Sequence, residues 1–338
     1  MNNSITSTSQ AHHEIGHLPL SPPDSALNTP NAQHRSDYLA SHGLNDTLLH
    51  KIKDDLISIA LEAGRMITSA DPSISPSTPK NNSSDRVTAT DKAVEKKVHD
   101  RLTSLYPHFN FLGEETFTLG DKLASTPTFI CDPIDGTLNF IHGVPHTAVS
   151  LALTIDKKPI VGVVHNPLRG DTFAGVKWYG AFLTTAAGVT RRLPVSPVPK
   201  PMSSLNECLV AVEWGNQRAG PNWELRTAVH KQLLTDKAEG GAMVHSVRSS
   251  GSAALDFCYV AAGWIDLFWE GGVWVWDVAA GWIILEEAGG IVVSANPGDW
   301  EPTVEGRLYL AVRGAKRAEQ EGVVKELWAL MGDRKFVF

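Results

Sequence analysis

The stretch TFICDPIDGT at residues 128–137 places two acidic residues directly after an apolar run. Residues 128–131 predict a strand, and residues 132–137 predict a turn in which Pro133 fixes the backbone between Asp132 and Asp135. Both carboxylates can then face shared ions. Gly136 lets its backbone N–H approach an anionic oxygen closely, and the Thr137 hydroxyl can orient a water molecule. The alternative is an ordinary turn, since Asp, Pro and Gly are common turn residues.

Three further acidic residues lie at the ends of predicted structural elements. Glu114 and Glu115 come after the apolar run 109–112, and Asp277 lies at the expected start of a helix. Crowded carboxylates repel one another and raise their own pKa values, and a divalent cation removes that conflict. Magnesium prefers hard oxygen ligands, and two ions ~4 Å apart can hold both the attacking and the leaving oxygen of an in-line displacement. The pattern therefore favours a metal-dependent reaction at phosphorus.

The rest of the chain alternates between helical and strand-like segments. Apolar spacing predicts a helix from near Asn45 to Ser69 and a second one after Thr90, with Asp91 as its N-cap. Further helices are expected at 223–234, 252–262, 276–287 and 316–331, and strands at 109–112, 128–131, 149–155, 160–164, 172–176, 181–184, 209–213, 267–270 and 291–293. Mixed elements throughout imply layered α and β structure.

Composition limits the classes of partner. Residues 1–44 are rich in Ser, Asn, His and Pro and predict a mostly disordered arm before a domain at 45–338. The 338 residues include 30 basic and 37 acidic ones, a net charge of −7, which argues against a nucleic-acid surface. No apolar run approaches the roughly 20 residues of a membrane span, and the N-terminus lacks a secretory signal. We expect a cytoplasmic protein that acts on a small molecule.

Four segments together carry a resemblance to a known family. They are VTATD at 87–91, FLGEE at 111–115, DPIDGTLNF at 132–140, and WDVAAG at 276–281 running on to EAGG at 287–290. From near Asn45 to the C-terminus the chain resembles the inositol monophosphatase family of magnesium-dependent, lithium-sensitive phosphatases. The resemblance implies an α+β fold, a five-layered α-β-α-β-α sandwich of the inositol monophosphatase and fructose-bisphosphatase type. Family members are commonly homodimers, so a homodimer is expected.

The resemblance also implies a set of two to three Mg²⁺ ions. Glu114, Asp132 and the carbonyl oxygen of Ile134 would bind the first ion, and Asp132, Asp135 and Asp277 the second. A third, weaker ion would lie near Glu114 through waters. Thr137, in contact with Asp91, would help to activate the attacking water.

Substrate contacts follow from the same resemblance. The amides of Gly136 and Thr137, next to Asp135, would hold the phosphate, and Lys80 would lie on a mobile loop that closes near the site. The residues expected to contact the alcohol are Gly251, Ser252, Ala253, Glu270 and Asp277. Plainer interpretations stay open: Asp91 as only a helix cap, Glu270 as a surface charge, and Glu115 facing either solvent or metal.

The substrate is less well specified than the reaction. The arm has no counterpart in compact members, Trp274 and Val275 are bulkier or more apolar than expected, and residues 213–218 belong to a region that varies with substrate. The pattern is similar to fungal members associated with quinate-utilisation gene clusters. We expect hydrolysis of myo-inositol 1- or 4-phosphate by a metal-activated water. The alternatives are another polyol, sugar or histidinol phosphate, or a catalytically idle regulatory member of the quinate pathway.

Overall fold

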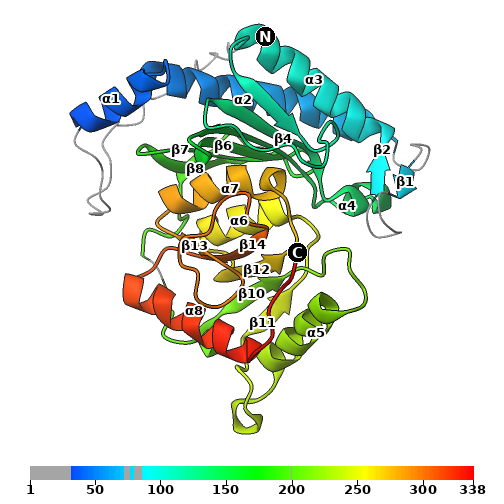
Figure 1. The fold of residues 1–338 in the computed structure, drawn as a ribbon, viewed down its shortest axis with the longest axis vertical. Coiled ribbons are helices and arrows are strands. Elements are labelled where there is room, and N and C mark those ends of the chain that lie inside the picture. Colours follow the sequence, from blue (N-terminus) through cyan, green and yellow to red (C-terminus); the bar gives the residue numbers. More distant parts are fainter. Residues whose placement is uncertain (1–31, 72–76, 80–85, 199) are drawn as a thin grey trace, which may run out of the picture.

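Helices and sheets alternate in five layers along the long axis of the molecule (Figure 1). The structure, a computed structural model, describes residues 32–71, 77–79, 86–198 and 200–338, with the backbone alone at 77–79, 86 and 87. The layered α+β architecture confirms the predicted fold class.

The outermost layer consists of α2 (Asp46–Ser69) and α3 (Ala89–Leu105), which pack on one face of the larger sheet. Asn45 caps α2, because its side chain accepts a hydrogen bond of 2.8 Å from the Leu48 N–H. The helix α3 begins in a capping box, in which Thr88 is the N-cap and Asp91 occupies the third helical position. The prediction that Asp91 is itself the N-cap is therefore wrong by three residues. The first helical turn starts earlier because Thr88 supplies the capping oxygen.

The larger sheet has seven strands in sequence order. They are β3 (Asn110–Gly113), β4 (Thr128–Asp135), β5 (Ala148–Ile155), β6 (Lys158–Asn166), β7 (Asp171–Val176), β8 (Gly180–Thr184) and β9 (Thr190–Arg192). Only β3 and β4 are parallel neighbours. The register between β4 and β5 shifts between Asp132 and Asp135, where three steps on β4 face two on β5. In a regular strand, residues three apart point to opposite faces, so this bulge is what allows both carboxylates to face the same side.

The central layer is formed by α6 (Ala253–Ala262) and α7 (Val275–Glu287), which lie between the two sheets (Figure 1). Both helices are apolar on almost every side, as expected of helices covered on all faces. The strand β6 approaches α7 closely: a Cβ atom at Gly162 would lie 2.3 Å from the carbonyl oxygen of Ala280. Only glycine fits there, and the close approach fixes the middle of α7 relative to the sheet.

The second sheet has five strands in the order β11-β10-β12-β14-β13, covered by α5 (Pro221–Leu234) and α8 (Arg317–Met331). The strands are β10 (Leu209–Val212), β11 (Ser246–Arg248), β12 (Leu267–Gly271), β13 (Ile291–Val293) and β14 (Leu308–Val312). Shorter elements are α4 (Thr137–His142), the pair β1 (Ser77–Pro79) and β2 (Arg86–Thr88), and two 3₁₀ turns at Leu205–Glu207 and Lys237–Glu239.

An additional helix, α1 (Ala32–Ser41), lies before the first one expected. The prediction that residues up to 44 form a disordered arm is wrong for 32–44, whereas residues 1–31 lie outside the described part. Leu39 and Leu44 are buried in the same core as α2, and each such burial contributes about 1.5–3 kcal/mol. His42 also pairs with Asp156 at 3.1 Å. These contacts order a segment whose own apolar pattern is too short to predict a helix.

In the described residues, no helix has the length and apolar character needed to span a membrane.

Candidate active site

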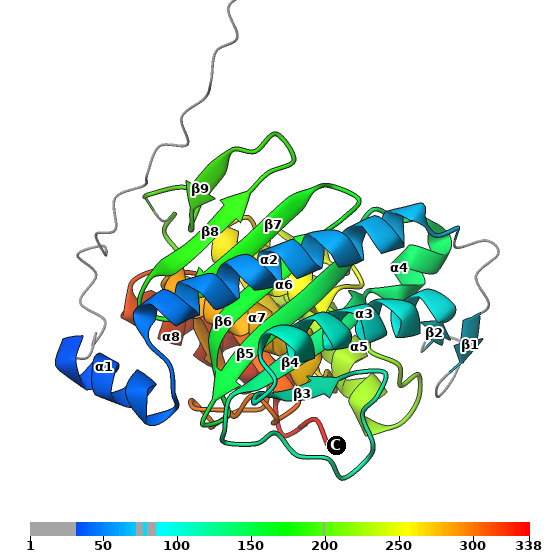
Figure 2. The ribbon, with the colours of Figure 1, turned by 90° about the horizontal axis from the view of Figure 1, so that it is seen from above.

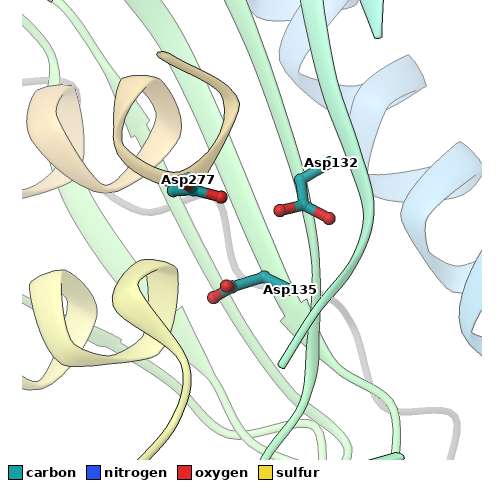
Figure 3. Close-up of side chains that lie close together, drawn as sticks. All are labelled: Asp132, Asp135 and Asp277. Carbon is teal, nitrogen blue, oxygen red and sulfur yellow. The ribbon is translucent and has the colours of Figure 1, made fainter. Parts of the chain in front are cut away.

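Three aspartates from two elements converge at the end of β4 (Figure 3). Asp132 and Asp135 belong to β4 and Asp277 to the first turn of α7. One carboxylate oxygen from each lies within 4.8 Å of the others. The structure therefore brings together three predicted metal ligands that are up to 145 positions apart in the sequence, and we call these residues the aspartate cluster.

Asp135 is fixed by the N-terminus of α6. Its Oδ2 atom accepts hydrogen bonds from the Ser252 hydroxyl at 2.5 Å and from the Ala254 N–H at 2.8 Å. Ser252 is also the N-cap of α6, so one hydroxyl links the helix end to the acid. These two hydrogen bonds hold the Asp135 carboxylate in its place in the cluster.

Asp277 is fixed by its own helix. Its Oδ2 atom accepts a hydrogen bond of 2.5 Å from the Trp274 N–H, which closes a capping box at the start of α7. The first turn of a helix carries partial positive charge, which favours a carboxylate there. The negative charge of Asp277 is therefore stabilised before any ligand binds.

The electrostatics of the cluster call for a cation. Burial, followed by the charges of Glu114, Asp135 and Asp277, raises the pKa of Asp132 well above its usual range. Burial and the Asp277 charge raise the pKa of Asp135 to about 7. Three carboxylates with hard oxygen donors at this spacing suit a divalent cation such as Mg²⁺, Mn²⁺ or Ca²⁺, which would neutralise the repulsion. The residues present thus fit a metal.

Glu114 lies beside the cluster without belonging to its tight core. It follows β3, which runs parallel to β4, and its N–H donates to the Cys131 carbonyl at 3.1 Å. Its charge is the first neighbour that raises the pKa of Asp132. The role of Glu114 as a metal ligand therefore stays a prediction. The Glu115 N–H donates a hydrogen bond of 2.7 Å to Glu95 Oε2. Glu95 is buried, and Glu115 is partly buried.

Asp91 and Thr137 are in contact, as predicted. The Thr137 hydroxyl lies 3.1 Å from Asp91 Oδ1 and 3.1 Å from the Ile134 carbonyl oxygen. Asp91 is fully buried and also accepts hydrogen bonds from the Thr88 hydroxyl and N–H. It is therefore a helix-capping residue and a partner of Thr137 at once. Because the single hydroxyl proton of Thr137 points to these acceptors, its lone pairs are free to accept from a water or ligand.

Gly136 begins the short helix α4 in the left-handed conformation, with φ of 87°. A Cβ atom at this position would lie 2.9 Å from the Gly251 carbonyl oxygen and 3.0 Å from that of His146. Glycine is thus required both by its backbone angle and by the close approach of a second loop. The first N–H groups of a helix lack intrahelical partners, so those of Gly136 and Thr137 are available to an anion.

The predicted alcohol-binding residues come to the same side of the aspartate cluster. Gly251, Ser252 and Ala253 form the loop into α6, and Ser252 is almost completely buried by its bonds to Asp135 and Leu255. Glu270 is 4% exposed, so the interpretation of it as a surface charge is wrong. It lies on β12 within the second sheet, which buries it. Burial, with the charges of Glu213, Asp277 and Asp256, raises its pKa well above the usual range, although Arg226 acts in the opposite direction.

Three residues that support this loop were not predicted. Glu213 accepts hydrogen bonds from the N–H groups of Ser250 and Gly251, the latter at 2.9 Å. Asp256 is fully buried and accepts from the Ser250 hydroxyl at 2.7 Å. Asn139 donates to the carbonyl oxygens of His146 and Ser250 at 2.6 and 2.7 Å, which joins α4 to the loop. Glu213 and Asp256 lie in none of the four motif segments, and although Asn139 lies in the segment 132–140, only the fold shows that it contacts this loop.

Lys80, Ile134 and His146 complete the residues considered for the site. Lys80 lies outside the described residues. Ile134 is buried and its carbonyl oxygen faces Thr137, so a metal contact there stays a prediction. His146 is largely enclosed beside Tyr259, and burial lowers its pKa to about 4.

Comparisons with known proteins agree with this geometry. The sequence profile of the inositol monophosphatase family matches residues 49–331. Inositol monophosphatase 2 of Saccharomyces cerevisiae is 46% identical over 254 residues, covering 74% of this chain and 83% of the yeast protein. Quinic acid degradation cluster protein x of Neurospora crassa is 40% identical over 278 residues, covering 74% and 81%. The crystal structure of the extragenic suppressor protein suhB from Bartonella henselae superposes with a TM-score of 0.68 at 28% identity, covering 84% of this chain and 99% of that one.

Proposed function

Because this chain belongs to the inositol monophosphatase family, we propose that it hydrolyses a monophosphate ester of inositol with Mg²⁺ as its cofactor. The observation that carries the proposal is the aspartate cluster, in which three carboxylates from β4 and α7 converge within 4.8 Å. Beside it lie a buried acid–hydroxyl pair, Asp91 and Thr137, and the N–H groups at the start of α4. An acidic centre, a water-orienting hydroxyl and an anion-binding turn are what hydrolysis of a phosphate ester needs.

Magnesium suits this donor set because it prefers carboxylate and carbonyl oxygens and keeps several waters. Asp132, Asp135 and Asp277 would hold one ion, and Glu114 and the Ile134 carbonyl would complete the site of another with Asp132. When bound, Mg²⁺ would polarise a water for attack and stabilise the charge on the departing oxygen.

The residues of the chain then have separate tasks. Asp91 holds the proton of Thr137, so that the hydroxyl oxygen accepts a hydrogen bond from the attacking water and aligns it. The N–H groups of Gly136 and Thr137 bind the phosphate oxygens. Ser252 keeps Asp135 in place, and Glu270 is positioned to accept a hydrogen bond from an alcohol hydroxyl of the substrate.

Inositol is favoured as the alcohol by the relatives, since the yeast protein is named an inositol monophosphatase at 46% identity. A buried carboxylate such as Glu270 is also a costly feature unless a polar ligand group pairs with it. The similarity to the Neurospora quinic acid cluster protein supports a second candidate, a member of the family linked to quinate metabolism that acts on another monoester or does not catalyse at all.

The test is phosphate release from a panel of inositol, sugar, polyol and histidinol phosphates, with and without Mg²⁺ and with added Li⁺. We expect turnover of inositol 1- or 4-phosphate that requires Mg²⁺ and is inhibited by Li⁺. The Asp132→Asn variant should lose more than about a hundredfold in kcat/KM, because even residues that only support a metal ligand contribute 10–100-fold. Preference for a different phosphate ester would change the proposed substrate but would leave the proposed reaction, hydrolysis of a phosphate monoester, unchanged. No turnover of any member of the panel would favour the non-catalytic candidate.

A further inference from the structure

A second hollow lies on the outer face of the seven-stranded sheet, away from the aspartate cluster. The helix α2 lies across the middle of this face, and β7, β8 and β9 extend beyond it without a covering helix (Figure 2). Between α2 and these strands is a groove of about 850 Å³. We call it the α2 groove. None of the residues of the aspartate cluster lines it.

The lining of the α2 groove is cationic, although the chain as a whole has a net charge of −7. Four arginines and lysines line it, and no carboxylate does so among the residues that the structure describes. Arg35 pairs with Asp46 at 3.1 Å and Lys53 with Asp54 at 2.9 Å, so these two are partly neutralised. Arg65 and Arg192 have no ion pair within the described ranges. Two positive charges of the groove therefore have no counterion among the residues that the structure describes.

Two of the cations gather at the end of the groove formed by the β7–β8 turn. The guanidinium of Arg35 lies over the ring of Tyr179, 5.2 Å from its centroid. The guanidinium of Arg192 lies so close to Gly180 that a Cβ there would be 2.7 Å from Nη2. His50 packs edge-on against the same Tyr179 ring, with 4.5 Å between centroids. Arg35, which also pairs with Asp46, and Arg192 thus contact neighbouring residues of the same turn, Tyr179 and Gly180.

The remainder of the groove is long and mainly apolar. Ile57 and Leu61 of α2 form one wall, and Ala174, Val176 and Phe182 belong to the sheet side. The lining residues of α2 run from position 50 to 68, a length of roughly 27 Å at 1.5 Å per residue. This length and the apolar walls suit an extended aliphatic chain.

We propose that the α2 groove binds an unbranched aliphatic carboxylate, with the carboxylate between Arg35 and Arg192 and the chain along α2. Charge complementarity selects the anion, and the apolar walls bury the chain at about 25 cal/mol per Å². Arg35 belongs to α1, which lies before the region matched by the family profile at 49–331. The site thus combines the shared fold with a helix that the family profile does not cover, and it is independent of the proposed reaction.

Binding is tested by isothermal titration of the full-length protein with decanoate, and with decan-1-ol as the uncharged counterpart. We expect saturable binding of one decanoate per chain and at least tenfold weaker binding of the alcohol. The double variant Arg35→Gln/Arg192→Gln should weaken decanoate at least tenfold. The single variant Leu61→Glu, at a side chain that is 39% exposed, should weaken it similarly by adding a negative charge to the wall.

The matched control is Arg317→Gln/Lys325→Gln on α8, where both cations pair with Glu321 and neither lines the groove. It removes the same charge and should leave binding unchanged, and thermal unfolding of every variant shows that each is folded. Absence of saturable binding, equal binding of the alcohol, or an equal loss in the control would overturn the proposal. So would a concentration-dependent dimer in sedimentation that the Arg35→Gln/Arg192→Gln variant abolishes, since the groove would then be covered by a second copy.

Discussion

Replacing Asp135 by Asn should stabilise the metal-free protein while abolishing its activity. Asn keeps a side-chain oxygen that can accept from Ser252 and Ala254, so the loop into α6 stays in place. It removes one of three negative charges that lie within 4.8 Å of one another. Without a cation, that charge is a cost to the fold rather than a benefit.

The magnitude follows from the pKa of Asp135, which is raised from 3.8 to about 7 in the folded state. A carboxyl whose folded pKa exceeds its unfolded value binds more protons when folded, so the free energy of unfolding falls as pH rises between these values. A difference of roughly three pKa units corresponds to about 4 kcal/mol as an upper limit. The metal-free variant should therefore exceed the wild type by about 2–4 kcal/mol at pH 8, and the two should be nearly equal below pH 4.

The assay is urea unfolding followed by tryptophan fluorescence, in EDTA at pH 4 and pH 8 and with Mg²⁺ at pH 8. Mg²⁺ at a hundred times its Kd should raise the unfolding free energy of the wild type by about 2.7 kcal/mol and that of the variant much less. Asp333→Asn, at an exposed position after α8, is the control and should change neither value. A variant less stable than wild type in EDTA at pH 8, or one that Mg²⁺ stabilises equally, would refute the reasoning.

Three further substitutions test individual parts of the site. Gly136→Ala should lower the free energy of unfolding by about 1–3 kcal/mol and remove most of the activity, because φ is 87° and the added Cβ would meet the Gly251 carbonyl oxygen at 2.9 Å. Thermal unfolding and phosphate release measure the two effects, and an active, stable variant would contradict the role of the turn. Thr137→Val should lower kcat by about a hundredfold with little change in KM, since a positioned proton acceptor contributes 10²–10⁴-fold. Thr137→Ser should keep most of the wild-type kcat, and equal rates for the Val and Ser variants would contradict a role for the hydroxyl. Glu270→Gln should raise KM for inositol 1-phosphate by about tenfold with little effect on kcat, as expected when one hydrogen bond of about 1.5 kcal/mol to a charged group is weakened. A loss confined to kcat would contradict this and show that Glu270 acts in the chemical step.

The sequence predicts most of the helices and strands, and the acidic residues of the aspartate cluster, because both depend on local patterns. The strands and helices from residue 45 onward carry clear apolar periodicity, and Asp132, Asp135 and Asp277 each stand at the end or start of such an element. The bulge that turns Asp132 and Asp135 to the same side cannot be predicted from a local pattern. It depends on pairing with β5, and a sequence that reads as strand followed by turn does not reveal it.

The elements that escaped prediction are those whose stability comes from neighbours. The helix α1 is held by the burial of Leu39 and by contacts to residues far along the chain. The strands β9 and β11 are short and mainly polar, so they carry no apolar signal, whereas the apolar strand β14 is absent from the prediction. Buried carboxylates such as Glu213 and Asp256 likewise depend on the fold, since in a sequence they look like ordinary surface acids. The homodimer, the cytoplasmic location and the role of Lys80 stay predictions.

The most direct test of the central claim is the binding of Mg²⁺ to the aspartate cluster, measured by isothermal titration of the metal-free protein at pH 8 alongside phosphate release in the same samples. The account predicts saturable Mg²⁺ binding that rises in parallel with activity, and the loss of both in Asp132→Asn and Asp277→Asn. Mg²⁺ binding and activity that both persist in these variants would contradict it.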